Sequence, residues 1–335
     1  MAVLPAMRLL FITNSRIGDA VLSTGLLDHL IRTHPGLRVT IACGRVAAPL
    51  FEGVPGLERL HVMHKRPRAG HWRTLWRQCV GTRWDLLVDL RGSPMPWVLR
   101  ARRRLIPTDG RSTEDHRVRR VGSALGPDGF ADPPAPRLWT SPEDEAAADA
   151  ALGGPAASNR PLLVLAPTAN WIAKTWPADR FVTLARELTA PDGPLPGAPV
   201  AVVAAPNERE AARPVLEGLA GPDLLDLIGR LDLLGVLAVL RRARLFVGND
   251  SGLMHMAAAA GAPTVGLFGP SRDTHYAPWG PLGRVVRTDE PYEVLFPPDL
   301  DPTTVRASRM TSLPVSRVLD TAAALVRQTE GIGPR

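Results

Sequence analysis

Short apolar runs alternate with amphipathic stretches along most of this chain, and that alternation restricts it to folds built from β-α-β units. In the first half, apolar runs at 8–13, 38–43 and 85–90 accompany a helical pattern from Asp19 to Thr33. Such units place parallel strands in one sheet and helices on its faces. The chain is therefore predicted to be an α/β protein.

The same pattern restarts in the second half of the chain and predicts a second α/β unit. Apolar runs at 161–167, 198–206 and 244–250 alternate with helical patterns that begin at Pro177, Glu208 and Leu233. The 335 residues fit two domains of ~100 to 200 residues each. Two parallel-sheet domains of similar size are expected to hold a ligand in the cleft that the carboxyl ends of their strands face.

A helix capped by Ser141 and followed by a Gly-, Pro- and Ser-rich stretch supplies the expected boundary between these domains. We therefore expect one domain at residues 1–155 and another at residues 156–335. A last helical pattern, with apolar residues spaced from Val315 to Leu325, predicts a terminal helix. Its docking surface is not identified by the sequence.

Composition narrows the class of protein further. With 45% hydrophobic and 22% charged residues, the chain is not disordered, collagen-like or a coiled coil. Its two cysteines, Cys43 and Cys79, cannot build a disulfide framework, and no Cys/His cluster has zinc spacing, so we expect a reducing compartment and no metal. Arg8 interrupts the N-terminal apolar stretch, and no stretch of ~18 residues is continuously apolar. We therefore expect neither a signal peptide nor a membrane span, and a cytoplasmic location.

The positive charge of the chain is concentrated in residues 61–120. That segment carries 15 Lys and Arg against 5 Asp and Glu, although the whole chain has a net charge of only +7. Such a patch suits a phospholipid surface, a phosphorylated glycolipid or a nucleic acid, but it also fits a solvated surface. Only Lys65 and Lys174 are lysines, so we attribute most of the Arg excess to genome composition. No nucleic-acid-binding module accompanies the arginines, so we expect no nucleic-acid partner.

The loop after the first apolar run carries a carboxylate toward the expected cleft. The sequence NSRIGDA follows Thr13, with Gly18 permitting a close turn and Asp19 near the start of a helix. Asp19 has two interpretations: it caps the helix, or it acts as a general base. The loop is neither a GxGxxG nor a Walker sequence, which disfavours dinucleotide-dependent dehydrogenases and P-loop enzymes.

Residues 246–271, FVGNDSGLMHMAAAAGAPTVGLFGPS, give the strongest local signal, because a strand runs into a Gly-flanked turn and an Ala-rich helix. Free N–H groups at the start of that helix, after Asp250, Ser251 and Gly252, attract phosphate, so a diphosphate would fit the turn. Asp250 either caps the helix or serves as a functional carboxylate. His255 either donates to a phosphate or sugar oxygen or packs as a core residue.

Two further loops of the second half carry charged groups. Lys174 lies between two tryptophans, after a strand end and before a helix, and is either a phosphate contact or an exposed loop lysine. Glu208 lies in the loop APNERE after the next strand. It either accepts hydrogen bonds from ribose hydroxyls or is an acidic residue at a helix N-terminus.

Three segments together, residues 8–42, 174–189 and 246–270, resemble glycosyltransferase family nine, the ADP-heptose:lipopolysaccharide heptosyltransferases. The resemblance spans nearly the whole chain in order and continues into SRMTSLPVSRV, where Arg309 stands in place of a usual cysteine. It implies a GT-B fold, in which two Rossmann-like domains face a central cleft. The N-terminal domain would bind the acceptor, and the C-terminal domain would bind the nucleotide sugar.

The resemblance also implies roles for individual residues. Asp19 matches the proposed catalytic base, which deprotonates the acceptor hydroxyl as it attacks the anomeric carbon, so that the configuration inverts. Lys174 matches a lysine near the donor phosphates, Glu208 approximates a ribose-binding acid, and Leu231 falls at a base-contacting position. The implied donor-binding residues are Thr168, Asn170, Glu208, Leu231, Asp250, Ser251, Gly252 and His255. The implied acceptor-side residues are Gly18, Arg100, Arg102, Arg103 and Arg104.

The expected activity is metal-independent transfer of a heptose or related sugar from an ADP-sugar to a lipopolysaccharide-core or similar glycan acceptor. No cofactor beyond the nucleotide sugar is expected, because a fixed cation and helix N–H groups stabilise the leaving diphosphate. The only DxD sequence, Asp299–Asp301, lies in a Pro-flanked loop and is interpreted as solvated surface. The basic segment suits peripheral contact with an anionic glycolipid at the inner face of the membrane. Two alternatives stay open: a hydrolase or epimerase of the same fold, and a non-catalytic nucleotide-sugar-binding protein.

Overall fold

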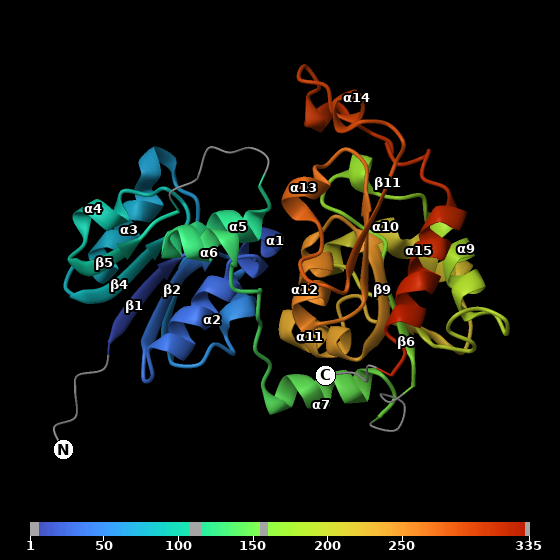
Figure 1. Cartoon of the computed structure of the whole chain (residues 1–335), viewed down its shortest axis with the longest axis horizontal. Coiled ribbons are helices and arrows are strands. Elements are labelled where there is room, and N and C mark those ends of the chain that lie inside the picture. The colour runs from blue at the N-terminus through green and yellow to red at the C-terminus, as the bar shows by residue number, and fades with distance from the viewer. Residues whose placement is uncertain (1–6, 108–114, 155–159, 332–335) are drawn as a thin grey trace. The chain divides into compact units, whose positions relative to one another are not determined.

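The chain forms two compact units (Figure 1). The computed structural model describes residues 7–107, 115–154 and 160–331. Unit 1 is Met1–Trp139 and unit 2 is Thr140–Arg335. Within the described ranges, no helix is both long and apolar enough to cross a membrane.

Helix α7 (Pro142–Ala151) belongs to unit 2, so the chain divides earlier than the boundary expected from the sequence. Ser141 caps α7 in a capping box, as the sequence predicts. The helix packs on α11 (Leu233–Arg241), and Arg242 pairs with Glu145 at 2.6 Å. These contacts attach α7 to unit 2, because both partners of the ion pair are at most one-third exposed and little screened.

Unit 1 is built on a five-stranded parallel sheet with the order β3-β2-β1-β4-β5. Its strands are β1 (Arg8–Ile12), β2 (Arg38–Gly44), β3 (Leu57–Met63), β4 (Trp84–Asp89) and β5 (Ala101–Leu105). Its helices are α1 (Ile17–Val21), α2 (Thr24–Thr33), α3 (Gly70–Cys79), α4 (Met95–Val98), α5 (Arg117–Gly122) and α6 (Pro127–Ala131). Short 3-10 turns η1 (Ala48–Phe51), η2 (Pro67–Ala69) and η3 (Ser123–Leu125) complete it. The central strands β1 and β4 are buried except at Arg8 and Asp85, as the continuous apolar runs predict.

The helix expected from Asp19 to Thr33 is in fact two helices, α1 and α2. The Ser23 hydroxyl donates to the carbonyl of Ala20 at 2.7 Å and forms a 2.8 Å hydrogen bond with the Thr13 hydroxyl. Side-chain bonds of this kind compete with the helical hydrogen-bond ladder. They also tie the end of α1 to the end of β1, which fixes the position of the loop that carries Asp19.

Unit 2 is built on a six-stranded parallel sheet with the order β11-β10-β9-β6-β7-β8. Its strands are β6 (Leu162–Ala166), β7 (Val200–Val202), β8 (Leu224–Asp226), β9 (Ala243–Asn249), β10 (Thr264–Phe268) and β11 (Gly283–Arg287). Its remaining helices are α9 (Ala178–Thr189), α10 (Arg209–Gly218), α12 (Gly252–Ala260), α13 (Asp273–Tyr276), α14 (Tyr292–Leu295) and α15 (Val315–Gln328). Its 3-10 turns are η4 (Ile172–Lys174), η5 (Pro206–Glu208) and η6 (Pro302–Thr304). Both sheets confirm the predicted parallel α/β architecture.

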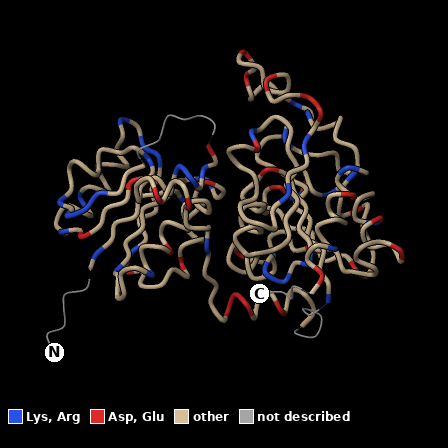
Figure 2. The backbone as a smooth tube through the Cα atoms, viewed as in Figure 1, with Lys and Arg blue, Asp and Glu red and all other residues tan. Residues whose placement is uncertain are grey.

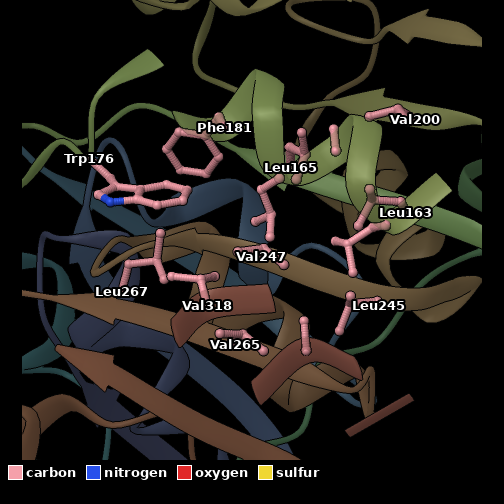
Figure 3. Close-up of a cluster of buried hydrophobic side chains, with 14 of the residues drawn as sticks. Leu163, Leu165, Trp176, Phe181, Val200, Leu245, Val247, Val265, Leu267 and Val318 are labelled. Carbon is pink, nitrogen blue, oxygen red and sulfur yellow. The ribbon is translucent and has the colours of Figure 1, made fainter. Parts of the chain in front are cut away.

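The terminal helix α15 docks on the sheet of its own unit (Figure 1). Val318 lies in one core cluster with Leu245, and Figure 3 shows Trp176 and Phe181 in the same cluster. The rings of these two aromatic residues meet edge to face with centroids 5.0 Å apart. Arg244 donates to the carbonyl of Val326 at 2.7 Å. The docking surface that the sequence leaves unidentified is therefore the face of the unit 2 sheet formed by β9, β10 and β11, beside α9.

Candidate functional site

Unit 1 carries a first candidate site, the loop between β1 and α1. Arg16 is the N-cap residue of α1, and no side chain caps this helix, so Asp19 is not its cap. The Asp19 carboxylate instead lies 3.6 Å from the guanidinium of Arg117, and each side chain is about one-fifth exposed. Gly18 precedes Asp19 within the same turn of α1. A partly exposed carboxylate held at the carboxyl edge of a parallel sheet is placed for ligand chemistry.

A second loop at the same edge follows β4. The buried carboxylate of Asp89 accepts hydrogen bonds from the backbone N–H groups of Arg91 at 3.0 Å and Ser93 at 2.6 Å. Burial raises the pKa of Asp89, although these N–H groups and the Ser93 hydroxyl oppose that rise. Arg91 in turn donates to the Ser15 hydroxyl at 3.0 Å and lies over the Trp72 ring. The loop after β4 therefore braces the loop that carries Asp19.

In unit 2, Lys174 and Asp250 form the centre of a second candidate site. The Lys174 Nζ atom lies 2.5 Å from Asp250 Oδ2, and Asp250 is only 6% exposed. Asp250 precedes Ser251, the N-cap residue of α12, so Asp250 does not cap that helix. The buried His255 places Nε2 4.0 Å from Asp250 Oδ1. Lys174, from the loop after β6, thus meets Asp250 and His255, which lie 76 residues or more further along the chain, directly after β9 and in α12. The three form one polar cluster at the carboxyl edge of the sheet.

The N-terminus of α12 adds N–H groups to this polar cluster. Helix α12 begins at Gly252, and the first N–H groups of a helix have no partner within it. The Ser251 hydroxyl is buried and makes no hydrogen bond to any other described residue. A fixed ammonium beside a helix N-terminus is an arrangement that binds phosphate.

Asn249 joins the two loops that carry this arrangement, and sequence reasoning missed it. Its side chain accepts from the backbone N–H of Trp176 at 3.0 Å and donates to the Pro167 carbonyl at 2.8 Å. Asn249 is fully buried at the end of β9. It lies within the predicted donor turn, but nothing in the sequence indicates which neighbouring backbone groups it binds.

We expect Asn249→Ala to lower the free energy of unfolding by about 2–3 kcal/mol, because it removes two buried hydrogen bonds and leaves their backbone partners unsatisfied. Urea unfolding measures this loss, and Asn207→Ala, at an exposed position on η5, is the matched control. A loss for Asn249→Ala no larger than that of the control would contradict the assignment.

A second cluster in unit 2 joins Thr168 and Glu208. Glu208 Oε2 accepts from the Thr168 hydroxyl at 2.8 Å and from the Ala205 N–H at 3.1 Å. Among the described residues, no group donates to Glu208 Oε1. Asn170 is exposed and Leu231 is half-buried at the loop after β8. The structure therefore brings Thr168 and Glu208 together, whereas the side chains of Asn170 and Leu231 form no hydrogen bond with that cluster among the described residues.

Ser308 and Arg309, in the segment before α15, hold the Lys174 loop through hydrogen bonds. The Arg309 N–H donates to the Ala173 carbonyl at 3.0 Å, and the Ser308 hydroxyl donates to the Thr175 carbonyl at 2.6 Å. The Arg309 side chain donates to the Leu295 carbonyl at 2.9 Å. The residue at position 309 thus supports the loop chiefly through its backbone, which a replaced side chain can still supply.

The four predicted acceptor-side arginines have different environments. The Arg104 guanidinium donates to the carbonyls of Pro96 and Ala101, at 2.5 and 3.1 Å, and so supports the fold. Arg102 pairs with Asp85 at 3.5 Å. Arg100 and Arg103 are exposed. The segment is therefore only partly free to meet a ligand.

Neither cysteine nor a clustered metal site offers another chemistry. Burial raises the pKa of Cys43 to about 12 and that of Cys79 to about 11, so neither thiol is a ready nucleophile. Within residues 7–107, 115–154 and 160–331, no group of three or more His, Cys, Asp and Glu side chains is placed to hold a metal ion.

Comparison with known proteins identifies similar enzymes. Residues 112–295 match the model of glycosyltransferase family 9 (heptosyltransferase). The chain is 32% identical over 134 residues to lipopolysaccharide heptosyltransferase 2 of Salmonella typhimurium, a match that covers 39% of this chain and only 37% of that relative. It is 28% identical over 301 residues to lipopolysaccharide heptosyltransferase 1 of Pseudomonas aeruginosa, covering 79% of each chain.

A solved structure shows the fold. The E. coli ADP-heptose lps heptosyltransferase II superimposes with a TM-score of 0.74 at 23% identity, over 97% of this chain and 100% of that one. The two parallel α/β units are therefore those of a GT-B fold, as the sequence predicts.

Proposed function

Because the chain belongs to glycosyltransferase family 9, we propose that it is an inverting glycosyltransferase that moves a heptose or related sugar from an ADP-sugar to a lipopolysaccharide-core or similar glycan. The observation that carries this proposal is the Lys174–Asp250 pair beside the N-terminus of α12. Both similar relatives bear the name heptosyltransferase, and the similar solved structure is that of an enzyme named for ADP-heptose.

The donor is proposed to bind unit 2 through its diphosphate. As the glycosidic bond breaks, the leaving diphosphate gains negative charge, and groups that are already fixed stabilise this charge more in the transition state than in the ground state. The ion pair with Asp250 holds the Lys174 ammonium in place, and the α12 N–H groups are fixed by the helix. We propose that these groups suffice without a metal ion. In the DxD segment, Asp301 already accepts from the Thr303 N–H at 2.8 Å, which supports a local turn role.

The acceptor is proposed to bind unit 1 and to be activated by Asp19. In this mechanism Asp19 takes the proton of the acceptor hydroxyl while the oxygen attacks the anomeric carbon and the nucleoside diphosphate leaves. One displacement inverts the configuration at that carbon. Arg117 restrains the Asp19 carboxylate from a distance of 3.6 Å. Support for this role comes from the exposure of Asp19 and from the finding that it does not cap α1.

Glu208 is proposed to bind a ribose hydroxyl of the donor through Oε1. We expect Glu208→Gln to weaken ADP binding by about tenfold, because it removes a charged hydrogen-bond acceptor. The amide oxygen of Gln can still accept from Thr168, so the loop should keep its shape. Calorimetric titration with ADP and with its 2′- and 3′-deoxy analogues tests this role. At least one analogue should bind wild type more weakly than ADP does. The same analogue should bind Glu208→Gln almost as well as ADP binds Glu208→Gln. An equal loss for each analogue in both proteins would contradict it.

We propose that transfer takes place in the cytoplasm, at the inner face of the membrane, where a lipid-linked acceptor is reached by peripheral contact. Support comes from the excess of basic residues in the segment 61–120 of unit 1. No nucleic acid takes part in this proposal.

A screen of ADP- and UDP-sugars by thermal shift, followed by transfer assays with the best donor, tests the function. We expect ADP-heptose to raise the melting temperature more than any UDP-sugar and to be consumed only when a glycan acceptor is present. Release of free sugar without acceptor would identify a hydrolase, and formation of an altered nucleotide sugar would identify an epimerase. Donor binding with no turnover under any condition would identify a non-catalytic binding protein. Each of these results would contradict the proposal.

A further inference from the structure

An exposed apolar patch lies on one face of unit 1, and no proposed catalytic or donor-binding residue belongs to it. Helices α3 and α4 pack against each other there. Trp76 on α3 and Val80, directly after α3, are each 39% exposed, Trp97 on α4 is 77% exposed, and Val98 on α4 is 48% exposed. These four residues, the apolar patch, are half of the large hydrophobic side chains that are exposed in the described part of the chain. Gathered apolar side chains on a surface mark an interaction site.

The apolar patch is not the outer edge of the core. The same two helices bury Leu75, Cys79, Met95 and Leu99 against the sheet. In α3, Trp76 follows Leu75 by one position and is therefore turned by about 100° away from it around the helix axis. The inward side chains already complete the packing of α3 and α4, and Trp76 and Trp97 lie beyond it.

Arginines surround the apolar patch. Arg73 and Arg77 are exposed on α3, and Arg100 is exposed directly after α4. Arg102 lies on the same sheet face, since it is two residues from Arg104, which donates to the Pro96 carbonyl of α4. Figure 2 shows basic residues gathered over this part of unit 1.

Acidic residues are nearly absent from this region. Residues 59–104 contain 12 Lys and Arg but only two acidic residues, Asp85 and Asp89. Asp89 is 1% exposed and is bonded to its own loop, and Asp85 pairs with Arg102. The region around the apolar patch therefore presents an unbalanced positive charge.

We propose that this face docks on an anionic lipid bilayer, with Trp97 and Trp76 in the headgroup region and the surrounding arginines on lipid phosphates. An indole ring suits that region because it is apolar on its faces and carries one N–H donor. Arginine places its apolar stem along the membrane surface and donates to phosphate with two N–H groups. A second copy of the chain would instead bring two positive faces together. The inference rests on the proposed function only in that a lipid-linked acceptor requires such contact.

Sedimentation with vesicles tests the proposal on the full chain. Wild type should bind vesicles of phosphatidylcholine with phosphatidylglycerol at least about tenfold more strongly than vesicles of phosphatidylcholine alone. Trp76→Ser with Trp97→Ser should lower binding to the anionic vesicles by about tenfold or more. The matched control is Val46→Ser with Val294→Ser, which removes two other exposed apolar side chains, 56% and 62% exposed, and should bind as wild type does.

Lipid brominated in its acyl chains tests insertion itself. It should quench the tryptophan fluorescence of wild type, and Trp97→Phe alone should lose part of that quenching. Trp97→Phe keeps an aromatic ring at an exposed position, so a failure to fold does not complicate the result. Quenching that Trp97→Phe leaves unchanged would overturn the proposal.

Three other results would overturn the proposal. The first is equal binding to neutral and anionic vesicles. The second is an equal loss of vesicle binding in the Trp76→Ser/Trp97→Ser and Val46→Ser/Val294→Ser variants. The third is a dimer that forms without lipid and that Trp76→Ser with Trp97→Ser abolishes. Donor binding by thermal shift and transfer to a water-soluble acceptor separate this inference from the proposed function. If neither wild type nor any of these variants transfers sugar, but vesicle binding follows the expected pattern, the proposed function fails and the docking surface stands.

Discussion

Replacing Asp19 with Asn is expected to remove nearly all sugar transfer and to leave donor affinity almost unchanged. Asn keeps the shape of the side chain but cannot take the acceptor proton, and loss of a general base lowers kcat by ~10²–10⁴-fold. Donor affinity is spared because every group that we propose to hold the diphosphate belongs to unit 2. Steady-state kcat and the Kd for ADP-heptose, measured on the same preparation, give both quantities.

Two variants of unit 1 control this result. Asp132→Asn changes an exposed carboxylate of the same unit and should keep wild-type kcat and Kd. Arg117→Gln removes the ion-pair partner of Asp19 and should lower kcat by about tenfold, because the base is then less well positioned. Wild-type kcat in Asp19→Asn would exclude Asp19 as the catalytic base.

Replacing Lys174 with Ala is expected to weaken donor binding and turnover together, lowering kcat/KM by ~10²–10³-fold. The Lys174 ammonium lies 2.5 Å from Asp250, which is 6% exposed. Its removal takes a cation from the diphosphate and also leaves a buried carboxylate that repels the same diphosphate. Both effects weaken the donor complex, and the first also destabilises the transition state.

Lys65→Ala is the matched control, because Lys65 is the only other lysine in the chain and is exposed in unit 1. The double variant Lys174→Ala with Asp250→Asn removes the uncompensated carboxylate and should recover thermal stability without recovering turnover. Full recovery of kcat/KM in the double variant would show that Lys174 serves only to neutralise Asp250.

The sequence was sufficient for the parallel sheets, because buried strands are continuous apolar runs such as Leu162–Ala166. It was also sufficient for the capping box at Ser141, which is a local pattern. The break between α1 and α2 was missed, because it involves a hydrogen bond between Ser23 and Thr13, which lies just after β1 and ten residues earlier in the chain. The attachment of α7 to unit 2 was missed for a similar reason, since it depends on Arg241, the last residue of α11, and on Arg242, which follows it, and both pair with Glu145.

The candidate site shows the same division between local and distant information. Local sequence placed Asp19 and Asp250 beside helix starts but could not decide between a cap and a functional carboxylate. The structure decided against the cap in both cases, because Arg16 and Ser251 occupy the N-cap positions. Arg117 could not be found from the sequence, because nothing near it indicates that it pairs with a residue of α1.

Single-turnover transfer with enzyme in excess over ADP-heptose tests the central claim most directly, because it separates chemistry from binding and from product release. We predict that wild type converts the bound donor to a glycoside of inverted anomeric configuration, and that Asp19→Asn binds the same donor but forms product ~10²–10⁴-fold more slowly. A product of retained configuration, or formation of product by Asp19→Asn at the wild-type rate, would contradict the account.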